Sequence, residues 1–456
     1  MKTANKKVTA ERLVKDALEK AKHFADYNIF TFLDEEGALA RAREIDARIA
    51  KGEKVGRLAG VPYALKDNFL SPRGETTAAA HILGGFVSPI TATSVEKIEA
   101  EGAIMIGRVN MDAFAHGSST ENSYYGPTLN SHDRERVAGG SSGGSAVAVA
   151  LDIVEFALGT DTGGSIRQPA AFNGIYGFKP TYGTVSRYGV VAMASSTDCI
   201  SFMAQTPDDI DLLMSIASGQ DPKDMTTLPD YYNDSKVKKV KKIGVVTDFD
   251  NDSIDIEIRK ALKKKCELLK SKGYEIVELS MPSLKYALNA YYVIVPAEVA
   301  SNLSRYDGIR YGFRSEKSEV LNDLYKHTRD EGFMPENKRR IMVGNFVLSS
   351  GFYDAYFLQA AKVRTLIVNE YAKAFEQCDF ILMPISPNPP FKLGEKVDDP
   401  VAMYMEDMMS VSTNLAGIPG LAVPAGETTN GLPIGLQLVG PRRSDKSLIE
   451  FSKELN

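Results

Sequence analysis

Two glycine- and serine-rich segments, 139–145 and 159–167, contain the residues whose types and spacing could do chemistry. Ser141 and Ser165 each follow directly on a Gly-Gly pair. Glycine permits backbone conformations that other residues avoid, and it lets amide N–H groups approach a ligand without an intervening side chain. A serine hydroxyl activated by a neighbouring base can attack a carbonyl carbon, and nearby amides can stabilise the oxyanion that forms. The apolar stretch 146–156 between the loops predicts a buried helix and strand.

A flexible linker, a phosphate-binding loop and a nucleophile elbow are the alternative interpretations of these segments. Glycine and serine runs are common in linkers, but a linker is not normally followed at once by an apolar stretch and a second glycine loop. The chain has no Gly-Lys dipeptide and the run does not fit G-x-G-x-x-G, which argues against a nucleotide-binding loop. Residues 139–143 do read G-x-S-x-G, but His327 is the only histidine that follows, so a Ser-His-Asp triad is a poor fit.

Composition and charge narrow the class of protein. The chain has 456 residues, of which 43% are hydrophobic, and this is enough for a large core. The net charge of −5 argues against a free-standing nucleic-acid-binding protein. No signal peptide opens the chain and no long apolar run follows, so we expect a soluble, cytoplasmic protein. Three widely separated cysteines predict neither a disulfide framework nor a zinc site: Cys199, Cys266 and Cys378.

Helical and strand patterns alternate along the chain, which predicts an α/β fold. The helical patterns cover 9–23, 36–51, 93–101, 254–273 and 355–377. The strand patterns cover 61–65, 103–109, 243–249, 274–281 and 380–385. No stretch has the composition of an inter-domain linker, so we expect one domain over 1–456, with a catalytic core at about 55–210. The charged segment at about 300–345 is predicted to form a helical cap.

A third motif connects the glycine loops to a known family. Lys66 ends the short apolar strand of segment 60–68, Gly-Val-Pro-Tyr-Ala-Leu-Lys-Asp-Asn. With the two glycine loops, this segment resembles the amidase signature family, and the resemblance covers the chain from about residue 25 to about 440. Within the family, five further segments resemble the A subunits of bacterial tRNA-dependent amidotransferases: 305–308, 338–342, 349–356, 398–404 and 414–420.

The resemblance implies a single α/β amidase-signature domain, with a mixed β-sheet flanked by helices on both faces, and a Ser-Ser-Lys mechanism. Ser165 would be the nucleophile, Ser141 the bridging serine that follows a cis peptide bond, and Lys66 the base. Lys66 can accept a proton only when it is neutral, so its pKa would have to fall from about 10.4 by roughly two or three units on burial. The resemblance also implies that backbone amides stabilise the oxyanion, from Thr162, Gly163, Gly164 and Ser165 itself.

The same resemblance implies glutamine as the substrate. Its α-carboxylate favours a bidentate arginine, and its α-ammonium favours a carboxylate or a tyrosine hydroxyl. The resemblance places Arg340 on the carboxylate, and Asp407 with Tyr291 on the ammonium. Arg339 and Tyr292 are adjacent alternatives.

The resemblance also implies that two partner subunits take part in the reaction. Ammonia would pass to a B subunit that uses ATP and Mg²⁺ to convert Glu-tRNA(Gln) to Gln-tRNA(Gln), and in related bacteria Asp-tRNA(Asn) to Asn-tRNA(Asn). A small C subunit would complete the heterotrimer. We expect no cofactor in this chain, no contact with a membrane, and tRNA bound mainly by the B subunit.

His116 precedes the polar loop 117–123, which the resemblance places beside the active site. Relatives more often carry an apolar residue at this position, so we assign His116 no catalytic role. We predict a structural histidine with satisfied ring nitrogens.

Three other functions are compatible with parts of the pattern. A free-standing amidase would use Lys66, Ser141 and Ser165 on small aliphatic, aryl or acyl amides. A non-catalytic assembly subunit would keep the fold without the chemistry, but all three catalytic residues are present. A cysteine nucleophile at Cys199 is disfavoured, because no histidine lies in a recognisable pairing with it.

Overall fold

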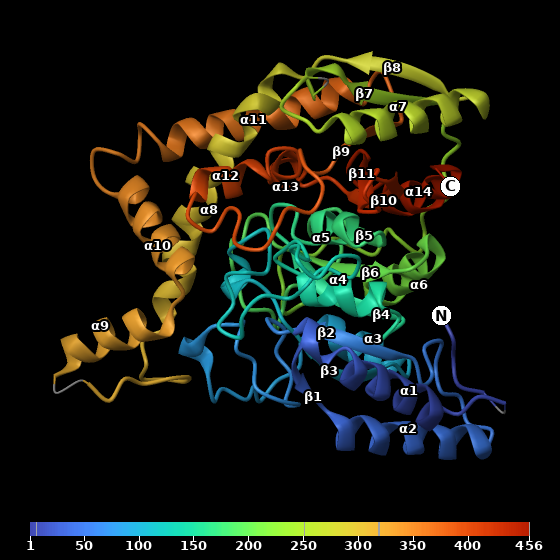
Figure 1. The fold of residues 1–456 in the computed structure, drawn as a ribbon, viewed down its shortest axis with the longest axis vertical. Coiled ribbons are helices and arrows are strands. Elements are labelled where there is room, and N and C mark those ends of the chain that lie inside the picture. The colour runs from blue at the N-terminus through green and yellow to red at the C-terminus, as the bar shows by residue number, and fades with distance from the viewer. Residues whose placement is uncertain (6, 250, 318–319, 456) are drawn as a thin grey trace.

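One mixed β-sheet of 11 strands runs through the molecule. The computed structural model describes residues 1–5, 7–249, 251–317 and 320–455, so parts of the predicted domain and cap (residues 6, 250, 318, 319 and 456) lie outside the described residues. The strands are β1 (Phe30–Leu33), β2 (Pro62–Lys66), β3 (Ile104–Val109), β4 (Phe156–Asp161), β5 (Tyr176–Lys179), β6 (Cys199–Ala204), β7 (Lys242–Val246), β8 (Glu275–Leu279), β9 (Phe380–Pro384), β10 (Gly420–Glu427) and β11 (Pro433–Val439). They are ordered β1-β3-β2-β4-β6-β5-β10-β11-β9-β7-β8, and Figure 1 shows β1 and β8 at opposite ends of the molecule.

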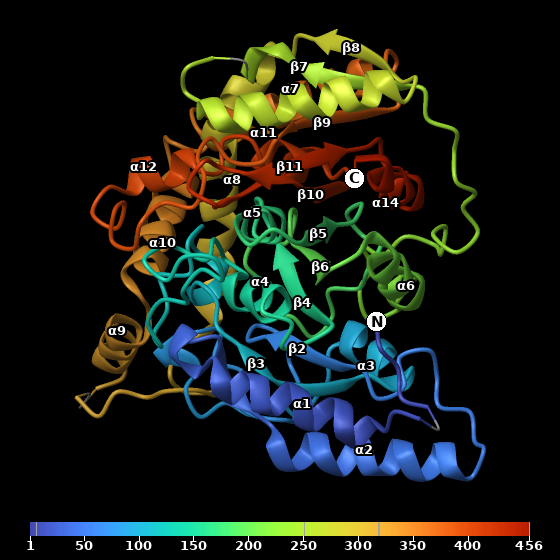
Figure 2. The ribbon, with the colours of Figure 1, turned by 45° about the vertical axis from the view of Figure 1, so that its right-hand side comes forward.

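Helices cover both faces of this sheet, as predicted. They are α1 (Ala10–His23), α2 (Glu35–Ala50), α3 (Thr93–Ala100), α4 (Gly143–Ala150), α5 (Arg167–Phe172), α6 (Pro207–Ala217), α7 (Ile256–Ser271), α8 (Ala287–Asn302), α9 (Leu321–Gly332), α10 (Pro335–Leu348), α11 (Phe357–Ala374), α12 (Pro400–Met405), α13 (Val411–Ala416) and α14 (Asp445–Ser452). Helices α1, α2, α4 and α5 cover the face turned toward the viewer in Figure 2. Helices α3, α6 and α14 pack on the opposite face.

Strands β2 and β4 bring the chemistry-bearing segments together. They are parallel neighbours, with Tyr63 opposite Phe156 and Leu65 opposite Leu158. The carboxyl ends of parallel strands meet at one edge of a sheet, so the residues that follow these two strands lie close together. Helix α4 begins directly after Ser142 and packs on both strands, which brings the first glycine loop to the same edge.

The helix and the strand that connect the two glycine loops extend beyond the predicted apolar stretch 146–156. Helix α4 starts at Gly143, and β4 starts at Phe156 and continues to Asp161. Small residues explain the difference. A side chain at Gly144 would collide with the backbone of Asn110, and one at Gly159 would collide with Ile166, so these glycines allow tight packing that an apolar pattern does not report.

The predicted cap segment contains α9 and α10, which lie at one side of the molecule in Figure 1. Helix α10 packs closely on α8, because Gly344 lies against the carbonyl oxygen of Pro296. This contact holds the residues of α8 and α10 beside the catalytic edge of the sheet. No helix within the described residues is long and apolar enough to cross a lipid bilayer.

Candidate active site

Lys66 lies at the end of β2 and is fully buried. Its Nζ atom is 2.8 Å from Ser141 Oγ, 2.7 Å from Ser142 Oγ and 3.1 Å from Thr160 Oγ1. Burial lowers the pKa of Lys66 from 10.5 to about 7, although nearby carboxylates partly oppose the shift. The direction and the size of this pKa shift agree with what a lysine base needs, since a large fraction of the molecules carry a neutral Lys66 near pH 7.

Ser141 follows a cis peptide bond from Gly140, as expected. The backbone around this bond is held from two sides. The N–H of Gly140 donates to Gln168 Oε1 at 2.9 Å, and the N–H of Asp112 donates to the carbonyl oxygen of Ser141 at 3.2 Å. The Ser141 hydroxyl is thereby fixed beside the Lys66 amine.

Ser165 lies in the turn between β4 and α5 and is 7% exposed. Its carbonyl oxygen accepts a hydrogen bond of 3.2 Å from the N–H of Ser142, which ties the two glycine loops together. Within the part of the chain that the structure describes, no hydrogen bond uses the Ser165 hydroxyl. Catalytic hydrogen bonds often form only when substrate is bound, so this geometry is compatible with a nucleophile.

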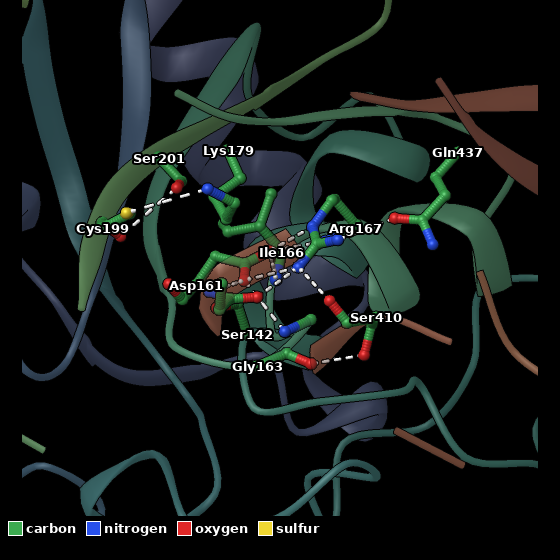
Figure 3. Close-up of polar contacts among 12 residues, drawn as sticks. Ser142, Asp161, Gly163, Ile166, Arg167, Lys179, Cys199, Ser201, Ser410 and Gln437 are labelled. Atoms are coloured by element: carbon green, nitrogen blue, oxygen red, sulfur yellow. Dashed lines mark hydrogen bonds and ion pairs between the residues drawn. The ribbon is translucent and has the colours of Figure 1, made fainter. Parts of the chain in front are cut away.

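A buried ion pair between Asp161 and Arg167 braces the turn that carries Ser165 (Figure 3). Arg167 Nε and Nη2 donate to the two oxygens of the Asp161 carboxylate at 2.9 and 3.0 Å. Burial alone would raise the pKa of Asp161, but the Arg167 guanidinium holds it at about 2. Arg167 also donates to Gln437 Oε1 and to Asn414 Oδ1, at 2.7 and 2.6 Å, so the turn is anchored to the C-terminal half of the chain.

The predicted oxyanion donors form the tip of this turn, and they differ in whether their N–H groups are already hydrogen-bonded within the protein. The N–H of Gly164 donates to Asp161 Oδ1 at 2.9 Å, so this amide is engaged in supporting the turn. The N–H groups of Thr162, Gly163 and Ser165 have no hydrogen-bond partner among the described residues. Ser410 Oγ donates to the carbonyl oxygen of Gly163, which holds that peptide from the opposite side.

Replacement of Gly164 by alanine is expected to lower kcat by about ten- to a hundredfold, because this residue shapes the turn that carries Ser165. Gly164 has φ +131°, and an added Cβ would lie 2.4 Å from Ser410 Oγ, so both the backbone and the Ser410 contact would have to move. Steady-state kinetics with Gly426→Ala as the control separates these effects from a general glycine effect, because Gly426 has φ +123° and open space around it. Equal kcat values for the two variants would contradict this account of the turn.

The three predicted substrate ligands come from α8, α10 and the segment between α12 and α13, and the structure brings them together. Arg340 is buried, its Nε donates to Glu336 at 2.8 Å, and its guanidinium lies over the rings of Tyr292 and Tyr404 at 5.0 and 5.5 Å. The adjacent Arg339 is 43% exposed and pairs with Glu336 from outside.

The tyrosine nearest to Asp407 is Tyr292. Its hydroxyl donates to Asp407 Oδ2 at 2.8 Å, and Ser118 Oγ donates to Oδ1 at 2.7 Å. Tyr291 instead packs on the turn that carries Ser165, where its hydroxyl lies 2.5 Å from the position of a Cβ on Gly163. Burial raises the pKa of Asp407 to about 6, against these hydrogen bonds.

Several residues of this site were absent from the sequence-based predictions. Ser142 and Thr160 contact Lys66, Asp161 and Arg167 brace the turn that carries Ser165, and the remaining contacts come from Ser118, Glu336, Tyr404 and Ser410. The sequence contains one signal for this ion pair: the acidic Asp161 and the basic Arg167 lie close on either side of the Gly-Gly-Ser segment 163–165. Among the described residues, no group of His, Cys, Asp and Glu side chains is arranged to hold a metal ion.

His116 departs from the predicted structural role. It is fully buried and its Nδ1 atom lies 2.7 Å from Asn337 Nδ2, but its Nε2 atom has no hydrogen-bond partner among the described residues. The expectation of two satisfied ring nitrogens is therefore wrong for one of them.

The fold and this serine–lysine site define an amidase, and comparison with known proteins agrees. The model of the Amidase family matches residues 12–449, so the chain belongs to this family. It is 50% identical over 416 residues to the glutamyl-tRNA(Gln) amidotransferase A subunit of Thermosynechococcus vestitus, with 90% of this chain and 86% of that protein covered. It is 47% identical to the glutamyl-tRNA(Gln) amidotransferase A subunit 2 of Clostridium acetobutylicum, over 99% of this chain and 96% of that protein. The crystal structure of the glutamyl-tRNA(Gln) amidotransferase A subunit of Thermotoga maritima superposes with a TM-score of 0.80 at 36% identity, covering 98% of this chain and 91% of that one.

Proposed function

We propose that this chain is the glutamine-hydrolysing A subunit of a tRNA-dependent amidotransferase. The observation that carries the chemistry is the buried Lys66 amine, 2.8 Å from the Ser141 hydroxyl at the edge of the sheet where Ser165 also lies. The full-length similarity to glutamyl-tRNA(Gln) amidotransferase A subunits supports the choice of substrate.

The reaction begins with proton transfer to neutral Lys66. Ser141 passes its proton to Lys66 and takes the proton of Ser165, whose Oγ attacks the side-chain amide carbon of glutamine. The N–H groups of Thr162, Gly163 and Ser165 stabilise the oxyanion, and removal of one such donor typically costs about 3 kcal/mol. Gly164, included among the donors in the sequence-based prediction, acts in this proposal by holding the turn through Asp161.

The tetrahedral intermediate then collapses. The C–N bond breaks, the proton returns through Ser141 to the leaving nitrogen, and ammonia departs from a γ-glutamyl ester on Ser165. Water attacks this ester with Lys66 again as the base, the Ser165 oxygen regains its proton, and glutamate is released.

Substrate recognition uses charges of both signs. Arg340 binds the α-carboxylate of glutamine, and Asp407 binds the α-ammonium. The hydrogen bond between Tyr292 and Asp407 favours Tyr292 as the tyrosine beside the ammonium, with Tyr291 supporting the turn that carries Ser165. A buried arginine and a buried carboxylate have no role with simple apolar amides, which favours this function over a free-standing amidase.

The ammonia would be used by a partner. In this proposal a B subunit binds ATP, Mg²⁺ and Glu-tRNA(Gln), or in addition Asp-tRNA(Asn), and a C subunit completes a cytoplasmic heterotrimer. This chain contributes the glutaminase site and no cofactor.

Ammonia release tests the function directly. The chain should release ammonia from L-glutamine, and the rate should rise when B and C subunits, ATP and Glu-tRNA(Gln) are added. Acetamide serves as the comparison substrate. Brisk hydrolysis of acetamide with none of glutamine under every condition would favour a free-standing amidase instead.

A further inference from the structure

A cavity of about 260 Å³ lies next to Arg340, the proposed ligand of the glutamine α-carboxylate. The loop before the first glycine segment, helix α10 and helix α12 enclose it, and its lining includes His116, Arg340, Glu336, Tyr404 and Glu121. The catalytic scheme above gives no role to His116, although this side chain is completely buried.

Hydrogen bonds around Asn337 determine which nitrogen of His116 carries the proton. The Oδ1 atom of Asn337 accepts from the N–H of Met334 at 3.2 Å, and its Nδ2 donates to the carbonyl oxygen of Ala113 at 2.8 Å. The nitrogen that faces His116 Nδ1 at 2.7 Å is therefore the amide donor, and Nδ1 is the acceptor.

The neutral imidazole then has its hydrogen on Nε2. Burial and the charge of Arg340 hold the pKa of His116 well below its usual value, so the ring stays neutral. Its Nε2–H group has no partner among the described residues, and a buried donor without an acceptor is unfavourable. A ligand in the cavity that offers an acceptor would remove this cost.

The N–H groups of Arg340 indicate which chemical group of a ligand would accept the hydrogen bond from His116. The Nε of Arg340 is used by Glu336, whereas its two Nη groups have no hydrogen-bond partner among the described residues. Two guanidinium N–H groups and one imidazole N–H match the oxygens of a carboxylate, which can accept about four hydrogen bonds. Glu121 Oε2 is also buried on this cavity and has no partner among the described residues, and its negative charge disfavours a simple anion. A zwitterionic amino acid suits the cavity better, because its α-ammonium, which Asp407 binds in the proposed function, offsets the charge of its carboxylate.

We propose that His116 is a specificity-determining residue, whose Nε2–H donates a hydrogen bond to the α-carboxylate of glutamine beside Arg340. This inference rests on the proposed function, because it names a further ligand of the same substrate. His116 contacts only the part of glutamine that does not react, so it contributes to binding rather than to the chemical step.

Kinetics with two substrates test the inference on the complex of this chain with its partner subunits. The substrates are L-glutamine and 4-aminobutanamide, which is glutamine without the α-carboxylate. For His116→Met we expect KM for glutamine to rise about tenfold, as for loss of a hydrogen bond to a charged group, with kcat nearly unchanged. The value of kcat/KM for 4-aminobutanamide should stay at that of the unmodified complex.

Three further variants complete the test. His116→Gln keeps an N–H donor and should hold KM for glutamine within about threefold, and His116→Leu replaces the methionine variant if that variant does not fold. His327→Met, on α9, is the matched control and should leave both substrates unaffected.

The outcomes separate the two claims. An unchanged KM for glutamine in His116→Met, or an equal loss with both substrates, would overturn the role of His116 while the proposed function stands. Failure of the unmodified complex to hydrolyse glutamine would overturn the proposed function, and this inference with it.

Discussion

Replacement of Ser165 by alanine is expected to lower kcat for glutamine hydrolysis by at least about a thousandfold, because it removes the hydroxyl that forms the acyl intermediate in the proposed mechanism. Ammonia release from the complex measures the loss. Ser145→Ala is the matched control: Ser145 is also a buried serine next to a glycine pair, but its Oγ donates to the carbonyl oxygen of Leu158 at 3.1 Å inside the fold. Retention of activity in Ser165→Ala, or an equal loss in Ser145→Ala, would contradict the assignment of the nucleophile.

Lys66→Met should have an effect of similar size, at least about a thousandfold in kcat/KM, because it removes the group that accepts the proton of Ser141 in the proposed mechanism. Methionine fills a similar volume and keeps the buried position apolar. Lys97→Met is the control, since Lys97 is a partly buried lysine that donates to the backbone carbonyl oxygens of Ala217 and Ser218, away from the site. Full activity in Lys66→Met would show that another group is the base.

The pH dependence of the unmodified enzyme follows from the same residue. The active form of Lys66 is the neutral one, so kcat/KM should fall tenfold per unit as pH drops below the Lys66 pKa of about 7, and should level off above it. Burial of Asp407 raises its pKa to about 6, so weakening of substrate binding should appear only at lower pH, as a rise in KM. A rate that is flat across pH 7, or one that falls as pH rises, would contradict a lysine base.

The α/β fold and the segments that carry Lys66, Ser141 and Ser165 could be predicted because their signals are local, whereas the catalytic roles of these residues came from the resemblance to the amidase signature family. Strand β2 ends at Lys66, as its apolar pattern indicates. The two Gly-Gly-Ser segments mark turns where a larger residue in place of glycine would collide with its neighbours. The contacts of Lys66 with Ser142 and Thr160 could not be predicted in this way. They depend on the parallel pairing of β2 with β4, which no single segment encodes.

The choice between Tyr291 and Tyr292 also depends on packing that the sequence pattern does not report. Tyr291 and Tyr292 are adjacent on α8, and one step along a helix turns a side chain by about 100°. The choice between them depends on how α8 packs against α10 and the segment that carries Asp407. The resemblance placed Tyr291 on the ammonium, with Tyr292 as the adjacent alternative. The packing of helices around Gly344 gives Tyr292 the contact with Asp407 and turns Tyr291 toward Gly163.

Trapping of the covalent intermediate tests the central claim most directly. The complex is mixed with L-glutamine below pH 7, where neutral Lys66 is scarce, quenched with acid and digested, and the peptides are analysed by mass spectrometry. We predict a γ-glutamyl ester on Ser165 that is absent from Ser165→Ala. Ammonia release without this ester, or a γ-glutamyl group on any other residue, would contradict a Ser165 acyl-enzyme.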